Sequence, residues 1–261
     1  MRNRVALALN NLEIGYTHNR LKRPVMGAIN ATLYAGEFVA LIGKNGAGKS
    51  TLLRTLSAFQ PPLSGTITYP DGCSTLRTAK ELSTMLAVVL TDNSRIYNLS
   101  VYEVVALGRT PYTNFLGRKR KHDEEIILQV MARMNIEHLA NRNINTLSDG
   151  ERQKVMIAKA LAQETEVIML DEPTSFLDFN SRVQLFRQLK QLAAETGKSI
   201  LVSTHDLELI LKMANRLWVM HDNRLHSGSV DELASAGLLS NFIDNQGIRY
   251  NIQQNSIDIV E

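Results

Sequence analysis

Apolar and polar residues alternate over the first part of the chain, from about residue 5 to residue 16. A period of two is typical of a strand that buries one of its faces. A loop containing Pro24 and Gly27 is expected next, followed by further strand patterns over residues 31–33 and 38–42. The beginning of the chain therefore predicts a group of strands.

Beyond this group, short apolar runs alternate with segments whose apolar residues have helical spacing. The expected strands cover residues 67–69, 85–90, 167–170, 199–202 and 217–220, and the expected helices cover residues 49–58, 183–192 and 207–214. Pro61 and Pro62 end the first of these helices, and Gly197 lies near the end of the second. This alternation predicts an α/β fold with a mainly parallel sheet and helices on both of its faces.

Residues 91–146 have a different character, with no strand pattern among them. Residues 101–107 and 123–134 have helical spacing, and the second segment gathers its apolar residues on one side. Gly108 and Pro111 break the first helix. We therefore expect an all-helical insert here, whereas the last 30 or so residues of the chain show no clear motif.

The composition narrows the class of protein. A chain of 261 residues with 44% apolar and 21% charged residues can bury a substantial core, and its net charge of +3 is too small to indicate a nucleic-acid binder. Cys73 is the single cysteine, which excludes an intramolecular disulfide and a zinc ribbon. The longest apolar run is residues 85–90, whereas a membrane-spanning helix needs about 20 residues. The apolar stretch 5–9 is also too short for a signal peptide, so we expect a cytosolic chain that would borrow any membrane part from another chain.

A glycine-rich turn follows the expected strand 38–42 and matches the pattern G-x-x-x-x-G-K-[ST] in full. The candidate nucleotide-binding residues of this phosphate loop are Gly43, Asn45, Gly46, Gly48, Lys49, Ser50 and Thr51. Glycines let the main chain wrap an anion with its N–H groups, and the helix that begins at Lys49 adds the positive end of its dipole. Lys49 would reach the β- and γ-phosphates of a nucleotide, and the Ser50 hydroxyl would ligate Mg²⁺.

Two acidic residues follow the apolar strand 167–170 directly. The carboxyl end of a parallel strand faces the crevice in which ligands bind in open α/β sheets. Asp171 would therefore hold Mg²⁺, and Glu172 would orient and deprotonate the attacking water. Together with the phosphate loop, these acids predict a catalytic site that acts on a nucleotide, without specifying the class of enzyme.

The segment 147–153, Leu-Ser-Asp-Gly-Glu-Arg-Gln, lies 23 residues before the acidic pair and opens a helix. With the two motifs above, it resembles the signature sequence of the ATP-binding cassette (ABC) ATPases, usually LSGGQ or LSGGE. The resemblance extends over nearly the whole chain. It implies a RecA-like phosphate-loop NTPase core with a mainly parallel sheet, antiparallel N-terminal strands and an inserted helical subdomain.

The same resemblance suggests roles for further residues. Tyr16 matches the aromatic residue that stacks on adenine, Asp178 lies in a D-loop-like segment, and His205 matches the switch histidine that senses the γ-phosphate. It also implies a division of the chain into an ATP-binding domain, 1–230, with a core of 1–90 and 147–230 and a helical subdomain of 91–146, followed by a C-terminal extension, 231–261.

The signature itself predicts a dimer. Ser148 and the main chain around Gly150, at the start of a helix, form an anion site that has no phosphate loop beside it in the sequence. In the family this site closes over the γ-phosphate held by a partner subunit. Each active site would then need two chains, and a monomer should hydrolyse ATP poorly.

Two positions depart from the family pattern. Thr91 stands where the family has a glutamine that joins the core to the helical subdomain, so we expect Thr91 to contact Mg²⁺ with a shorter reach than glutamine. Asp149 replaces the first glycine of the signature and would repel a γ-phosphate unless it is paired or points away.

Three functions compete: the ATPase subunit of a membrane importer, a soluble ABC ATPase of DNA repair or translation, and a small-molecule kinase. The kinase leaves segment 147–153 unexplained, and the chain lacks the sustained heptads, the zinc-binding cysteines and the second cassette of the soluble relatives. Residues 99–112 are similar to a stretch of the ATPases that serve iron–siderophore, haem and cobalamin permeases, although a loop between helices would also explain residues 108–112. The basic run 117–121 suits a solvated face or anionic lipid.

The favoured interpretation is an importer ATPase that uses ATP and Mg²⁺ and forms a homodimer. It would bind integral-membrane permease subunits at the cytoplasmic face of the inner (plasma) membrane as a peripheral protein. An extracytoplasmic substrate-binding protein would be an indirect partner, and no nucleic acid is expected.

Overall fold

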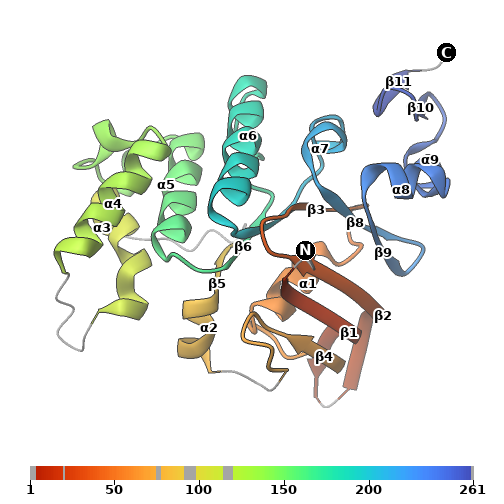
Figure 1. The fold of residues 1–261 in the computed structure, drawn as a ribbon, viewed down its shortest axis with the longest axis horizontal. Coiled ribbons are helices and arrows are strands. Elements are labelled where there is room, and N and C mark those ends of the chain that lie inside the picture. Colours follow the sequence, from red (N-terminus) through yellow and green to blue (C-terminus); the bar gives the residue numbers. More distant parts are fainter. Residues whose placement is uncertain (1–3, 20, 75–77, 91–97, 114–119, 260–261) are drawn as a thin grey trace.

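The computed structural model describes residues 4–19, 21–74, 78–90, 98–113 and 120–259. Within these residues, a six-stranded sheet runs through the centre of the molecule in the order β5-β6-β7-β3-β8-β9 (Figure 1). Its strands are β3 (Phe38–Gly43), β5 (Leu86–Val89), β6 (Val167–Asp171), β7 (Ser199–Ser203), β8 (Arg216–His221) and β9 (Arg224–Gly228). All neighbours pair in parallel except β8 and β9, which confirms the predicted, mainly parallel sheet.

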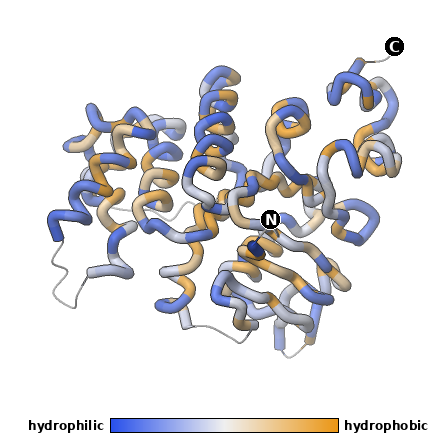
Figure 2. The backbone as a smooth tube through the Cα atoms, viewed as in Figure 1, coloured by the Kyte–Doolittle hydropathy of each residue, from blue (hydrophilic) through white to orange (hydrophobic). Residues whose placement is uncertain are grey.

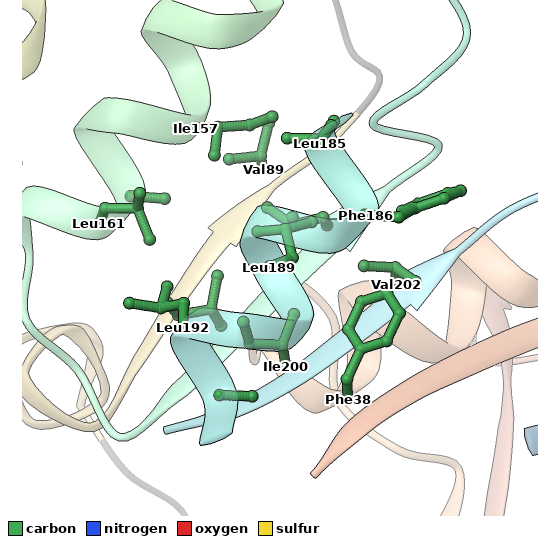
Figure 3. Packing of buried hydrophobic residues seen from close by; sticks show 14 of the residues in the cluster. Phe38, Val89, Ile157, Leu161, Leu185, Phe186, Leu189, Leu192, Ile200 and Val202 are labelled. Carbon is green, nitrogen blue, oxygen red and sulfur yellow. The ribbon is translucent and has the colours of Figure 1, made fainter. Parts of the chain in front are cut away.

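Helices α5 (Asp149–Ala162), α6 (Phe179–Thr196) and α7 (Leu207–Met213) supply apolar side chains to a core on one face of this sheet. Phe38 of β3 packs against Phe186 of α6, with ring centroids 6.0 Å apart (Figure 3). The hydropathy of α6 alternates along its length between hydrophobic and hydrophilic bands, as expected for a helix with one face on a sheet (Figure 2).

The opposite face of the sheet packs against helix α1 (Lys49–Leu56) and the N-terminal strands. Val39 and Leu41, which alternate with Phe38 along β3, belong to this second core. Trp218 of β8 is fully buried there, and among the described residues its indole N–H has no hydrogen-bond partner. The central sheet is therefore buried on both faces, as parallel sheets generally are.

An antiparallel sheet forms from the N-terminal strands in the order β2-β1-β4. Its strands are β1 (Val5–His18), β2 (Leu21–Tyr34) and β4 (Ser64–Thr68). The expected loop containing Pro24 and Gly27 was wrong, because both residues lie inside β2. Proline cannot donate to a ladder and is tolerated in β2 because this strand is an edge, where Pro24 pairs with Gly15 at a register shift.

The segment predicted as an all-helical insert contains only helical elements in its described part, beside the sheet (Figure 1). These are α3 (Val101–Ala106), the 3-10 helix η1 (Leu107–Tyr112), α4 (Lys121–Arg133) and the single turns η2 (Glu137–Leu139) and η3 (Ile144–Thr146). The α-helix ends at Ala106, just before Gly108, as predicted, and the chain continues as the 3-10 helix η1, which contains Gly108 and Pro111.

Several elements were not anticipated from the sequence. Helix α2 (Ala79–Met85) precedes β5 and begins with a capping box between Thr78 and Glu81. The end of the chain forms α8 (Val230–Ser235), α9 (Leu238–Ile243), β10 (Ile248–Asn251) and β11 (Ser256–Ile259). Among the described residues, no helix combines the length and the apolar character needed to cross a bilayer.

Candidate nucleotide-binding and catalytic site

The phosphate loop joins the end of β3 to the start of α1. Gly46 and Gly48 have φ values of +79° and +103°, which glycine adopts without strain. A Cβ atom on Gly48 would lie 2.6 Å from Cγ1 of Val25, whereas one on Gly46 would enter open space. With Gly43, Asn45 and Ser50, these glycines form a loop whose main-chain N–H groups and helix N-terminus suit a phosphate.

Lys49 is held beside Asp171, the last residue of β6, and Glu172, which follows it. Its Nζ donates to the carbonyl of Gly43 at 2.9 Å, and the residue is 7% exposed. Burial lowers the pKa of Lys49, while the charges of Glu172 and Asp171 act to raise it. The fold therefore brings the predicted phosphate-binding lysine together with both predicted acids.

Tyr16 of β1 lies next to the same loop. Its hydroxyl is hydrogen-bonded to Oγ1 of Thr51 at 2.9 Å, and 49% of the residue is exposed. A tyrosine that is anchored at its hydroxyl and open at its ring is suited to stacking on a base. The adenine contact stays a prediction.

The candidate catalytic pair lies at the carboxyl ends of β6 and β7, which are neighbours in the sheet. Glu172 Oε1 is 2.5 Å from Nε2 of His205. Asp171, 2% exposed, accepts a hydrogen bond from Oγ of Ser203, and the main-chain N–H of Glu172 donates to Oγ of the same serine. Parallel strands place their carboxyl ends on one edge, so residues far apart in the sequence meet here.

Sequence reasoning assigned no role to three residues of this region, Asp206, Arg182 and Ser203. Asp206 accepts hydrogen bonds from Oγ1 of Thr174 at 2.6 Å and from Nη1 of Arg182 at 2.8 Å. Nε of Arg182 also donates to the carbonyl of Leu177, and Ser203 contacts Asp171 and Glu172 as described above. The sequence signal that could have indicated them is the polar segment 203–206, which directly follows the apolar residues 200–202.

The signature residues lie in a separate depression of about 470 Å³, which also includes Asp178 and Lys154. No residue of the phosphate loop lines it. Ser148 caps α5 in a reciprocal capping box with Glu151, and its hydrogen bonds lower the pKa of that carboxyl. A Cβ on Gly150 would lie 3.2 Å from Cδ2 of Leu177, a tight contact that the leucine side chain would have to relieve by a small shift.

The other two acidic residues of this depression, Asp178 and Asp149, also have partners. Asp178 caps α6 by accepting from the N–H of Ser181, and this hydrogen bond lowers the pKa of Asp178. Asp149 forms an ion pair with Arg152, whose Nη1 is 3.3 Å from Oδ1. The pairing that the departure at Asp149 required is therefore present.

A magnesium ion suits the oxygen donors of Ser50 and Asp171. Mg²⁺ is commonly held by one or two carboxylates together with substrate phosphates, so it does not need a cage of protein ligands. Consistent with this, no group of three or more metal-binding side chains occurs in the described part of the chain. Asp171 is almost completely buried beside the phosphate loop's lysine, as such a ligand would be. Thr91, the third predicted ligand, lies outside the described residues.

Comparison with known families accounts for this arrangement of motifs. The family described as "ABC transporter" matches residues 26–175. The chain belongs to the ABC transporter family. It is thus an ABC ATPase, and the predicted resemblance and fold are confirmed.

Individual ABC transporter proteins show the same similarity. The ferric enterobactin transport ATP-binding protein FepC of Escherichia coli is 36% identical over 205 residues, which are 78% of this chain and 76% of that protein. The petrobactin import ATP-binding protein FpuC of Bacillus anthracis is 36% identical over 84% of this chain and 80% of its own length. A dimeric bacterial ABC transporter cassette superposes with a TM-score of 0.76 and 26% identity, covering 86% of this chain and 98% of that one.

Proposed function

We propose that this ABC ATPase is the ATP-hydrolysing subunit of an importer that takes up an iron chelate (a siderophore or haem) or cobalamin through partner permease chains. The observation that carries the catalytic part is the contact between Glu172 and His205 beside Asp171 and Lys49. A carboxylate paired with an imidazole at the edge of a phosphate site can accept a proton from water.

The residues divide the work of hydrolysis. The phosphate loop and Lys49 bind the triphosphate, and Tyr16 packs on the base. Glu172 accepts the proton of the attacking water. His205 contacts the Glu172 carboxylate and would hydrogen-bond to the γ-phosphate, which holds the two groups in position relative to each other. Ser50 and Asp171 would hold Mg²⁺, which when bound neutralises charge on the phosphates.

A homodimer completes the site in this proposal. The signature depression is lined by Ser148, Gly150 and Asp178 and by none of the phosphate-loop residues, so a phosphate entering it would come from another chain. The similarity to a cassette known as a dimer supports this arrangement. ATP would close the dimer, and hydrolysis would reopen it.

The cargo and the membrane setting rest on similarity. The relatives that serve ferric enterobactin transport and petrobactin import favour an importer of metal chelates. We place the chain at the cytoplasmic face of the inner (plasma) membrane as a peripheral subunit bound to integral-membrane permeases. An extracytoplasmic substrate-binding protein would deliver the cargo to those permeases.

The variant Glu172→Gln tests the catalytic assignment. It keeps the size of the side chain and one acceptor oxygen but removes the base, so ATP hydrolysis should fall by about a hundredfold or more, while ATP should trap a stable dimer. The measurements are phosphate release and light scattering with and without ATP. Glu208→Gln, in α7, is the matched control. Turnover of Glu172→Gln at the rate of the unmodified chain would refute the assignment.

A further inference from the structure

Ser203 ends strand β7 at the point where β6 delivers the two acids. It is fully buried and pairs in register with Asp171 on the neighbouring parallel strand. Its Oγ donates to Oδ1 of Asp171 at 2.5 Å. The same oxygen accepts the main-chain N–H of Glu172 at 3.0 Å, and that N–H also reaches the Ser203 carbonyl at 3.1 Å. One serine thus contacts both acids.

Both contacts act on groups whose orientation matters for the proposed chemistry. A carboxylate can rotate about its last bond, and the hydrogen bond from Ser203 to one oxygen of Asp171 restricts that rotation. Glu172 has a φ of +49°, a left-handed conformation that is costly for a residue with a side chain. The two oxygen atoms of Ser203 hold the N–H of this strained residue, which sets the direction in which the Glu172 side chain leaves the strand.

We infer that Ser203 is a positioning residue for ATP hydrolysis. Its hydroxyl orients the Asp171 carboxylate for the metal and fixes the backbone from which Glu172 reaches His205. The inference rests on the roles proposed above for Asp171 and Glu172. Ser203 itself touches neither nucleotide nor metal in this assignment.

Strand β7 contains its own control. Ser199, at the opposite end of the strand, is also buried, and its Oγ donates to the carbonyl of Tyr34 at 3.0 Å. Replacing either serine with alanine removes one buried hydroxyl from the same strand. Only the Ser203 variant removes a contact with the two acids.

The test compares Ser203→Ala, Ser203→Thr and Ser199→Ala in the full chain, well below the melting temperature of the least stable variant. Loss of a hydrogen bond to a charged group should lower the kcat of Ser203→Ala about tenfold. Titration calorimetry should show that ADP binding by this variant needs about tenfold more Mg²⁺, with unchanged ADP affinity in the absence of Mg²⁺. Ser203→Thr retains the hydroxyl and should recover both quantities to within about threefold, and Ser199→Ala should match the unmodified chain.

Two results would overturn the inference. One is a Ser203→Ala variant with the kcat and Mg²⁺ dependence of Ser199→Ala. The other is an alanine defect that threonine does not relieve, because the loss would then come from packing. In either case Glu172→Gln would still be inactive, so failure of this inference is separable from failure of the proposed function, in which Glu172→Gln keeps its activity.

Discussion

At Asp149, a carboxylate stands where the family signature has its first glycine. The side chain is 65% exposed and paired with Arg152, at the first turn of α5. An acidic residue is favourable at that end of a helix, and solvent screens an exposed charge. The substitution is therefore compatible with an anion site, at the cost of a modest repulsion toward an incoming phosphate.

Removing this charge should ease closure of the proposed dimer. In a Glu172→Gln background, Asp149→Asn should lower the ATP concentration at half-maximal dimerisation about two- to threefold, an effect sized by the weakness of exposed charge interactions. Light scattering across an ATP titration measures it. Asp222→Asn, which neutralises another exposed carboxylate, should change nothing. A higher ATP requirement for Asp149→Asn would contradict the expected repulsion.

The chemistry-bearing residues differ in how well the sequence announces them. Lys49, Asp171 and Glu172 belong to local motifs whose spacing is dictated by one strand and one loop, so they were predictable. Ser203 and Arg182 act through partners 32 and 24 residues away, respectively. Their significance depends on which elements are neighbours in the fold, β6 and β7 for Ser203 and α6 and the start of α7 for Arg182, and a single sequence does not specify those neighbours.

On the scale of elements, η1, α4 and the end of α5 meet at the buried side chain of Arg109. Its Nε donates to Asp123 at 2.9 Å, and its Nη1 donates to the carbonyl of Ala162 and to Glu164, both at 2.8 Å. The guanidinium also lies 4.3 Å from the ring centroid of Tyr112. The Arg-Thr-Pro-Tyr segment, which the sequence left open between a stretch typical of the importer ATPases and a loop between helices, contains the centre of a buried network.

This network continues into the sheet. The next residue after Ala162, Gln163, accepts from the Tyr112 hydroxyl at its carbonyl and donates from Nε2 to the carbonyls of Ser83 and Leu86. Gly108 allows the close approach, since a Cβ there would lie 2.3 Å from the carbonyl of Lys159. The helical insert is therefore tied to the α2–β5 junction as well as to α5.

Breaking this network should produce a pH-dependent loss of stability. A hydrogen bond from the N–H of Arg120 is the main cause that holds the pKa of Asp123 below its ordinary value, with help from Arg109. A carboxyl whose pKa is depressed in the folded state stabilises the fold above its unfolded pKa, and this contribution is lost as pH falls through the folded pKa. Asp123→Asn should thus cost about 1–3 kcal/mol at pH 7.

Urea unfolding at pH 7 and at successively lower pH measures the effect. The difference in unfolding free energy between the unmodified chain and Asp123→Asn should stay constant down to about pH 4, the ordinary pKa of aspartate, and should shrink at lower pH. Glu164→Gln alters a half-exposed partner of the same arginine and should cost less. A difference that does not change with pH would show that the Asp123 charge is not responsible.

The elements that sequence patterns missed share a physical cause. Arginine side chains are usually exposed unless they are paired. The burial of Arg109 could not be foreseen because its partners, Asp123 and Glu164, are distant in sequence. Pro24 favoured a loop because proline is tolerated in a strand only at a sheet edge. That β2 lies at an edge follows from tertiary pairing, which the local sequence does not specify. Local pattern was sufficient for the sheet's apolar strands and for α6, where burial and periodicity coincide.

At the scale of the whole molecule, the end of the chain is part of the main core. Leu239, Ile243 and Tyr250 are buried in the same cluster as the helix-covered face of the central sheet. The proposed boundary after residue 230 falls within α8, whose apolar residues also join this cluster. The division into an ATP-binding domain and an extension stays a proposal, and the packing predicts that the two parts unfold together.

A single substitution can test that coupling. Leu239→Ala removes a fully buried side chain and should lower the free energy of unfolding by about 2–5 kcal/mol. Ile252→Ala, also near the end of the chain but 54% exposed, should cost less than about 0.5 kcal/mol. Thermal unfolding followed by circular dichroism distinguishes the two. A separate, early transition in Leu239→Ala would instead indicate an independent C-terminal unit.

The burial of Trp218 has a practical consequence for every one of these measurements. It is the sole tryptophan of the chain, and in the parallel ladder it pairs with Leu41, two residues before the glycine that opens the phosphate loop. An indole in so dry a setting emits at short wavelength and shifts to the red once water reaches it. The protein therefore contains its own optical reporter, beside the strand that leads into the phosphate loop, that can be followed without attaching a dye.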